Sequence, residues 1–215
     1  MLFQGQVQSN VPASRATGQP NAEQLQLGEL AISEVLPRYA ATTWSNQGFS
    51  VSVGTAAAIT AYAGAAAGTP QIAVWNPAGS GKNLWPLIAS AGSVVAPSAA
   101  AVIAWALWYG PTAAITAAAS STFPVSQYSL QPSGSVAKAF VNTALTSSTA
   151  LTNVVPMGAL YWATAAGATL VPSIGGTEIP GYVMVPPGSM MAWGGSAALT
   201  SATWTGYLSW IELPV

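Results

Sequence analysis

Short apolar runs follow one another from Thr42 to the end of the chain, separated by Gly, Pro, Ser and Thr about every 8 to 12 residues. Within residues 49–53, 102–109 and 203–212, large apolar side chains alternate with small or polar ones. Because successive side chains of a β-strand point to opposite faces, this alternation predicts strands that each bury one face. We therefore expect an all-β fold, an antiparallel β-sandwich.

The same alternation predicts which side chains share a face. Ile72 and Val74 are expected on one face of a strand, and Trp75 on the other. In the last predicted strand, one face carries in turn Trp204, Gly206, Leu208, Trp210 and Glu212. Residues 183–193 predict a hairpin-like element, in which a Pro-Pro-Gly turn joins two strands.

Two alanine-rich stretches, 56–67 and 113–119, are ambiguous because Ala is the best helix former. Thr, Gly and Ile are interspersed in them, and neither has a charged pair at the i, i+4 spacing that supports an exposed helix. We interpret both stretches as strand or loop.

Charge is concentrated at the start of the chain. Of the four Lys or Arg and five Glu, five residues lie within the first 38: Arg15, Glu23, Glu29, Glu34 and Arg38. Residues 1–40 are also rich in Gln, Asn, Ser and Pro, which favours an extended polar N-terminal arm. Within it, residues 25–36 suit either one or two helical turns or pairing with a neighbouring subunit. Residues 41–215 are predicted to form a single β-sandwich domain.

The residue types that the chain lacks exclude several chemistries. All five acids are Glu, and there is no Asp, His or Cys. Nucleophilic triads need an imidazole base and aspartic dyads need two Asp, while zinc, haem and iron–sulfur sites need His or Cys ligands. Only Ca²⁺ or Mg²⁺ with oxygen ligands is left, and five scattered Glu make a poor cage. We predict no catalytic, cofactor-binding or metal-binding residue, and therefore no enzyme.

Nucleic acid and membrane are both disfavoured as partners. The net charge is −1, the pI is near 5.1, and the four cations, Arg15, Arg38, Lys82 and Lys138, do not cluster as phosphate binding requires. The most apolar stretch, residues 94–119, is interrupted by two prolines and consists largely of Ala, which inserts weakly into a bilayer.

Gly79-Ser80-Gly81-Lys82 resembles the end of a nucleotide-binding P-loop. The complete motif needs Gly where this chain has Asn76, and Ser or Thr where it has Asn83. We therefore interpret the segment as a turn between strands at 72–75 and 84–90, with its glycines at positive φ.

Glu178 and Glu212 could in principle form a general acid and base pair, as in glycoside hydrolysis. Two Glu within residues 39–215 are too few to indicate a catalytic site. We expect Glu212 to be either a solvated edge residue or the ion-pair partner of Lys82 or Lys138.

Nine Trp and seven Tyr raise the hypothesis of a carbohydrate-binding platform, because sugars stack on exposed aromatic faces. Core or interface positions are nevertheless more typical of aromatic residues in strands. Eight of the Trp lie in strand-like runs: Trp75, Trp85, Trp105, Trp108, Trp162, Trp193, Trp204 and Trp210. Trp44, near the end of the arm, is the least constrained.

Several segments carry a family resemblance. They are residues 75–84 (WNPAGSGKNL), 185–189 (VPPGS) and 208–215 (LSWIELPV), with Gly28-Glu29-Leu30 and Pro37-Arg38-Tyr39 upstream. In combination they resemble a family of small tailed-bacteriophage virion proteins of the capsid decoration or cement type.

The resemblance implies a jelly-roll-like β-sandwich displayed in many copies on the capsid surface of the virion. It implies homotrimers that stabilise the head by binding over junctions of major capsid proteins, with the arm adding contacts. The expected partners are thus the major capsid protein and copies of the chain itself. An alternative is a tail-fibre or receptor-binding adhesin that contacts host surface glycans through exposed aromatics, since residues 28–32 (GELAI) are similar to stretches near the starts of tail-fibre proteins.

Overall fold

The computed structural model describes residues 22–24, 30–32, 42–43, 45–95, 101–131, 134–162, 174–179, 181–196 and 198–215. The chain divides into two units, Met1–Ala41 and Thr42–Val215. In the first unit, β1 (Ala22–Gln24) pairs with β2 (Leu30–Ile32) in antiparallel register. A helical turn is therefore wrong for residues 30–32. The rest of the predicted arm lies outside the described residues, so the arm stays a prediction.

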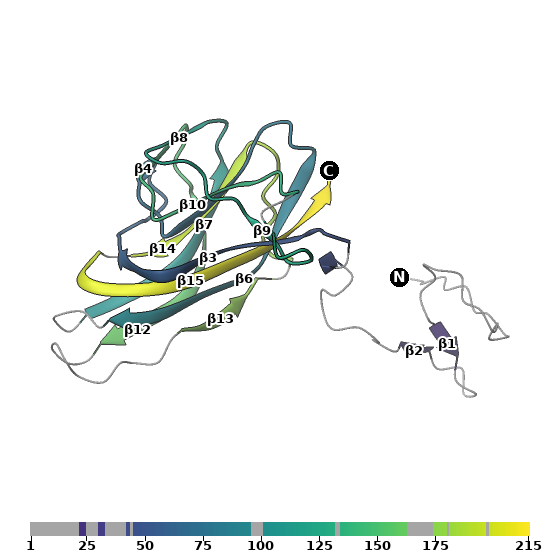
Figure 1. The fold of residues 1–215 in the computed structure, drawn as a ribbon, viewed down its shortest axis with the longest axis horizontal. Coiled ribbons are helices and arrows are strands. Elements are labelled where there is room, and N and C mark those ends of the chain that lie inside the picture. The colour runs from purple at the N-terminus through teal and green to yellow at the C-terminus, as the bar shows by residue number, and fades with distance from the viewer. Residues whose placement is uncertain are drawn as a thin grey trace. The chain divides into compact units, whose positions relative to one another are not determined.

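Two five-stranded antiparallel sheets form most of the second unit (Figure 1). We name each after its central strand. The β14 sheet has the order β10 (Lys138–Val141), β5 (Ile72–Asn76), β14 (Ser189–Gly195), β7 (Ala101–Pro111) and β12 (Asn153–Trp162). The β15 sheet has the order β13 (Ile174–Glu178), β6 (Lys82–Val95), β15 (Leu199–Pro214), β3 (Gly48–Ile59) and β9 (Val125–Ser126).

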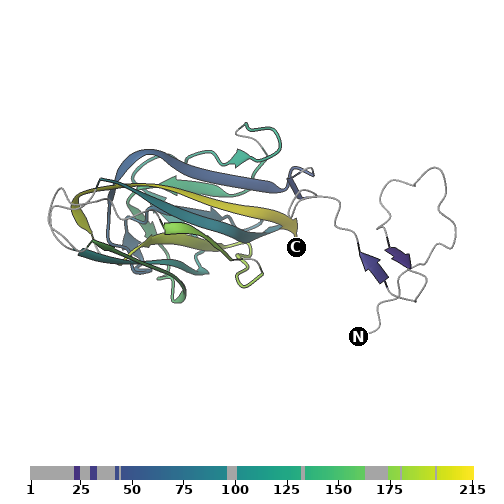
Figure 2. The same cartoon turned by 90° about the horizontal axis from the view of Figure 1, so that it is seen from below.

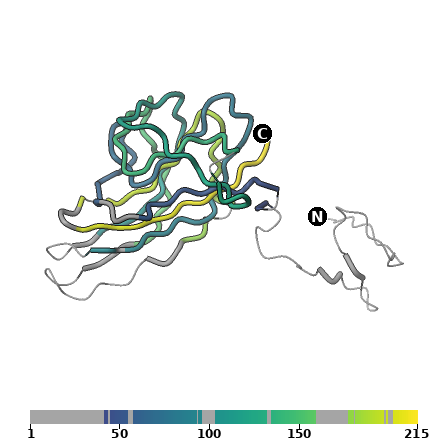
Figure 3. Tube along the Cα trace, in the orientation of Figure 1, coloured from purple at the N-terminus to yellow at the C-terminus, as the bar shows by residue number. Residues whose placement is uncertain are grey.

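β15 is the long central strand of its sheet. It runs between β3 and β6, as its yellow ribbon shows in Figure 2 and as the trace shows again in Figure 3. Its pairing extends from Thr203 opposite Val95 to Pro214 opposite Lys82. The end of the chain is therefore built into the middle of a sheet.

A third, small sheet has the order β4 (Ala67–Gly68), β11 (Leu145–Ser147) and β8 (Ile115–Ala117). It consists of short segments from the alanine-rich stretches and from the chain that follows β10. Strand or loop is thus confirmed for the described parts of both alanine-rich stretches.

The inward faces of the two large sheets pack together into one hydrophobic core, which makes the unit sandwich-like. The alternation read from the sequence is confirmed in β3, β7 and β15, each of which turns one face into this core. In β5 and β14 both faces are buried, because a second apolar cluster covers their outer face. The β15 sheet contributes Phe49, Val51, Val53, Ala89, Ala91, Trp204, Leu208 and Trp210, and the β14 sheet contributes Ile72, Val74, Ile103, Trp105, Leu107, Met191 and Trp193. The described residues are thus all-β with antiparallel sheets, as predicted.

The hairpin predicted for residues 183–193 is wrong. Only its second half is a strand, β14, while Val185 makes an isolated bridge to Leu84 of the β15 sheet. The turn, with Gly188 at a φ of 77°, therefore connects the two sheets rather than two neighbours in one sheet. Turn residues specify a reversal of the chain and leave open which sheet receives the next strand.

No helix long and apolar enough to cross a membrane occurs among the described residues.

Candidate functional site

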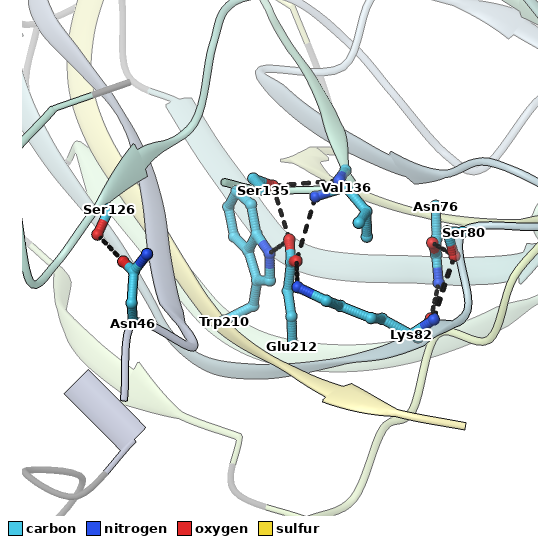
Figure 4. Close-up of polar contacts among 10 residues, drawn as sticks. Asn46, Asn76, Ser80, Lys82, Ser126, Ser135, Val136, Trp210 and Glu212 are labelled. Carbon is cyan, nitrogen blue, oxygen red and sulfur yellow. Dashed lines mark hydrogen bonds and ion pairs between the residues drawn. The ribbon is translucent and has the colours of Figure 1, made fainter. Parts of the chain in front are cut away.

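The most developed polar site surrounds the carboxylate of Glu212, which is fully buried on β15 (Figure 4). Lys82 Nζ lies 3.2 Å from Oε2, and the backbone N–H of Val136 donates to the same oxygen at 3.2 Å. Ser135 Oγ donates to Oε1 at 2.6 Å and Trp210 Nε1 at 3.3 Å. Both carboxylate oxygens are therefore satisfied, which a buried charge requires.

Three segments far apart in the sequence supply these donors. Lys82 begins β6, Ser135 and Val136 precede β10, and Trp210 shares with Glu212 the inward face of β15. The ion pair with Lys82 was one of the predicted roles of Glu212 and is confirmed, whereas a solvated edge position is wrong. Lys138, the other predicted partner, instead places its Nζ 5.5 Å from the ring centroid of Trp75.

Asn76 forms a second buried hub beside this site. Its Nδ2 donates to the carbonyl of Lys82 at 2.8 Å and to that of Val185 at 2.9 Å, and its Oδ1 accepts from Ser80 Oγ at 2.6 Å. This one side chain thereby fastens the turn at 77–81 and the bridge at Val185 to the end of β5.

The segment that resembles a P-loop is this turn, with Gly79 at a φ of 80° and Gly81 at 70°. It joins β5 to β6, as predicted, and the two strands belong to different sheets. The ammonium of Lys82, which would contact phosphate in a P-loop, is instead directed to Glu212. The geometry is that of a structural turn.

Glu178 and Glu212 are not assembled into an acid and base pair. Glu178 is exposed on β13 and lies opposite Ile88 of β6, whereas Glu212 lies opposite Leu84, a core residue. Directly opposed residues share a face of a sheet. Ile88 is adjacent to the core residue Ala89 on β6, so Ile88 and its partner Glu178 face away from the core. Leu84 and its partner Glu212 face into the core, and the two Glu therefore lie on opposite faces of the β15 sheet. Within the described residues, no three acidic or other metal-ligating side chains gather around one point.

Aromatic residues cluster inside the sandwich rather than on a platform. Trp105 and Trp193 stack at a centroid distance of 4.8 Å, and Trp204 meets them at 5.8 and 5.2 Å. These three and Trp210 are buried, which confirms core positions for them. Trp75, Trp85 and Trp108 are half-buried, and the side chains of Trp44 and Trp162 lie outside the described residues.

A third buried polar group is the side chain of Gln71, the residue before β5. Its Nε2 donates to the carbonyl of Thr60 at 2.5 Å, and its Oε1 accepts from the N–H of Gly195 at 3.1 Å. Tyr62 lies nearby, with its ring edge-on to Trp108 at 5.6 Å. Burial raises the pKa of Tyr62 to about 12.

Exposed apolar side chains are the feature that the sequence did not indicate. Tyr182 is 84% exposed, Phe123 and Leu130 are each 74% exposed, and Tyr128 is 55% exposed. All four lie in turns or loops, where no period distinguishes an exposed apolar residue from a buried one. A shallow groove of about 380 Å³ also lies over the small sheet, lined by Ala, Gly, Thr and Leu145.

The buried side chains of Glu212, Asn76 and Gln71 thus have structural partners. Four other buried polar atoms make no hydrogen bond within the described part of the chain: Trp105 Nε1, Trp193 Nε1, Asn142 Oδ1 and Thr203 Oγ1. The exposed features are loops and a neutral groove. Comparisons of the chain with protein-family models, with curated proteins and with solved structures found no match.

Proposed function

We propose that the chain is a structural virion protein of a bacteriophage, a capsid decoration or cement protein that stabilises the head. In this proposal it binds over junctions of major capsid proteins on the capsid surface and associates with copies of itself as a homotrimer. It needs no cofactor, nucleic acid or membrane, and it performs no catalysis. Residues 1–40 would serve as an arm that adds contacts to neighbouring subunits.

The observation that carries the proposal is the near absence of charge on the surface of the second unit. Its four charged residues are Lys82, Lys138, Glu178 and Glu212. Glu212 is fully buried and Lys82, with 32% of its side chain exposed, is paired with it. A freely diffusing protein usually depends on interspersed surface charge for solubility. A neutral surface instead suits burial against neighbouring subunits, where unpaired charges are costly.

We further propose that the sandwich is a jelly roll. Eight of its strands, taken in chain order, are β3, β5, β6, β7, β12, β13, β14 and β15. They alternate between the sheets except for β7 and β12, which are consecutive and pair in one sheet. The neighbours have the order β3-β15-β6-β13 in one sheet and β5-β14-β7-β12 in the other. Two four-stranded sheets interleaved in this way match the double Greek key of jelly rolls, which occur in viral capsid proteins. The fold supports the class of protein but does not specify its role.

Locating the chain on intact particles tests the proposal. A reconstruction of the virion at a resolution that distinguishes a sandwich domain should place this chain over junctions between major capsid subunits. Density for the chain on the tail alone, or in no part of the particle, would refute the cement role.

A tail-fibre or receptor-binding adhesin is the second candidate. The exposed rings of Tyr182, Phe123 and Tyr128 favour it, because such rings could stack on sugars. Adsorption of the purified chain to host cells, or binding to a glycan array, should then fall on Tyr182→Ala or Phe123→Ala. Unchanged adsorption for both variants would count against this role.

A further inference from the structure

Lys138 is an exposed cation on β10, and it forms no ion pair with any residue that the structure describes. Its Nζ lies 5.5 Å from the ring centroid of Trp75, the residue directly opposite it on β5. The face of an aromatic ring attracts an ammonium without accepting its hydrogen bonds in the way that a carboxylate does. The ammonium of Lys138 is therefore a fixed positive charge whose N–H donors are available to a ligand.

Lys138 and Trp75 lie on the outer face of the β14 sheet. The neighbouring residues on their strands, Ala139 and Val74, face the core between the two large sheets, and side chains alternate along a strand. Trp75 Nε1 donates to the carbonyl of Thr112 at 2.9 Å, and the indole packs against the second apolar cluster. The ring that faces Lys138 is thus held in one orientation.

A second aromatic ring lies on the other side of Lys138. Thr122 forms an isolated antiparallel bridge with Ala139, and its N–H donates to the carbonyl of Ala139 at 2.7 Å. Phe123 is therefore beside Lys138 and, by alternation, on the same face. The next residue, Pro124, is buried and restricts Phe123 to an extended backbone. Phe123 is thus held between two anchored neighbours, although it is 74% exposed.

Phe123, Lys138 and Trp75 form a row across the edge of the sheet, which we call the β10 patch. The residues that lead into it are polar: Ser120 and Thr122 are exposed, and Ser121 is half-buried. Anchor residues of protein interfaces are typically ringed by contacts that exclude water. A solvated aromatic ring with hydroxyl neighbours instead suits a sugar, which stacks one face on the ring and keeps its own hydroxyls hydrated.

The charge of the patch narrows the class of sugar. A neutral saccharide would use the ring of Phe123 and leave the ammonium of Lys138 without a partner. A saccharide that carries a carboxylate would use both, because a carboxylate accepts charge-assisted hydrogen bonds from an ammonium. The juxtaposition of an open cation with an exposed ring therefore favours an acidic sugar.

We propose that the β10 patch binds saccharides that contain a uronic acid or another carboxylate-bearing sugar. In this proposal the carboxylate pairs with Lys138, the apolar face of the sugar ring stacks on Phe123, and the ring of Trp75 keeps the ammonium in place. The inference gives a ligand class to the second candidate function and is independent of the cement role.

Titration of the full chain with oligogalacturonic acid, followed through the NMR signals of the indole N–H groups, tests the patch. The Trp75 signal should shift and saturate, while the signals of Trp105 and Trp193, which are buried in the core, should stay in place. The matched ligand is the same oligosaccharide with its carboxylates methyl-esterified, which keeps the sugar rings and removes the charge. It should bind about 5-fold more weakly, as expected for the loss of an exposed ion pair.

Variants of the patch separate the two contacts. Lys138→Met removes the ammonium and keeps an apolar stem, so it should weaken binding of the acid about 5-fold and abolish the preference over the ester. Lys138→Arg should keep that preference, because it keeps the charge. Phe123→Ala should weaken binding of both ligands. The control is Val154→Ala on β12, at the opposite edge of the same sheet, which should bind like the wild-type chain.

Three outcomes would overturn the proposal. The wild-type chain could show no saturable binding, the ester could bind as tightly as the acid, or the Lys138→Met and Phe123→Ala variants could bind like the wild-type chain. A polyglutamate peptide that shifts the Trp75 signal as strongly as the oligosaccharide would replace the sugar with an acidic protein segment as the ligand. Each outcome leaves the cement role unaffected, since particle imaging tests it separately.

Discussion

Lys82 Nζ lies 3.2 Å from Oε2 of Glu212, although the two residues are 130 positions apart in the sequence. The pair joins the first residue of β6 to the inward face of β15 within one sheet. Ser135 and Val136 add hydrogen bonds from the chain that leads to the other sheet. The site therefore ties together both layers of the sandwich at one end.

Removing one partner of this pair should destabilise the protein strongly. Lys82→Met leaves a buried carboxylate without its counter-ion, and we expect a loss of about 3 kcal/mol in the free energy of unfolding. The double variant Lys82→Met, Glu212→Gln should lose less than the sum of the single variants, because no charge is then left buried. Denaturant unfolding measures these differences.

The matched control for this cycle is Lys138→Met. Lys138 is exposed, and its ammonium lies over the face of Trp75, so its loss should cost about 1 kcal/mol or less. Equal losses for the Lys82 and Lys138 variants would contradict a special role for the buried pair.

Stability should fall in alkaline solution because Tyr62 is buried. Burial raises the pKa of Tyr62 to about 12, from about 10 in an unfolded chain. The unfolded chain therefore loses this proton first as the pH rises, so the contribution of Tyr62 is complete below pH 10 and is lost between about pH 10 and 12. The loss should be about 2 to 3 kcal/mol.

Melting temperatures measured from pH 5 to 12 test this dependence. Between about pH 5 and 9 the curve should be nearly flat, since the chain has no His or Cys to titrate there. Tyr62→Phe should reduce the alkaline loss of stability specifically. A variant that loses stability with pH as steeply as wild type would show that other groups are responsible.

A methyl group added at Gly206 should disrupt the tryptophan cluster. A Cβ at this position would overlap the ring of Trp204 and lie 2.9 Å from Cζ3 of Trp193. Because close-packed cores tolerate overpacking poorly, Gly206→Ala should cost about 3 kcal/mol or more and alter the tryptophan fluorescence. Gly54→Ala on β3 is the control, since a Cβ there meets no atom within 4 Å. Similar stability of the two variants would contradict tight packing at the cluster.

Deleting residues 1–40 should leave a folded domain that attaches to particles more weakly. The buried core lies within the second unit, so circular dichroism and the melting temperature of the truncated chain should stay close to those of the full chain. Binding to particles stripped of the protein measures attachment. A truncated chain that fails to fold would assign the arm to the core.

The sequence by itself determined the all-β class, the face of β3, β7 and β15 that enters the core, and the turn at 77–81. These properties depend only on neighbouring residues. Alternation at 49–53 or 102–109 distinguishes the two faces of one strand, and glycines at 79 and 81 indicate a backbone with positive φ. The absence of His, Cys and Asp likewise excluded several chemistries, because a side chain that the sequence lacks cannot be supplied by any fold of the chain.

Only the tertiary structure decided which residues meet. Glu212 obtains its partners from β6 and from the chain before β10, and Asn76 bridges the carbonyls of Lys82 and Val185. The sequence misled at 183–193 because a Pro-Pro-Gly turn looks the same whether it joins strands of one sheet or of two. The sequence did not indicate that Leu130 is exposed. Exposure and backbone conformation in a turn depend on hydrogen bonds to distant strands rather than on any local period.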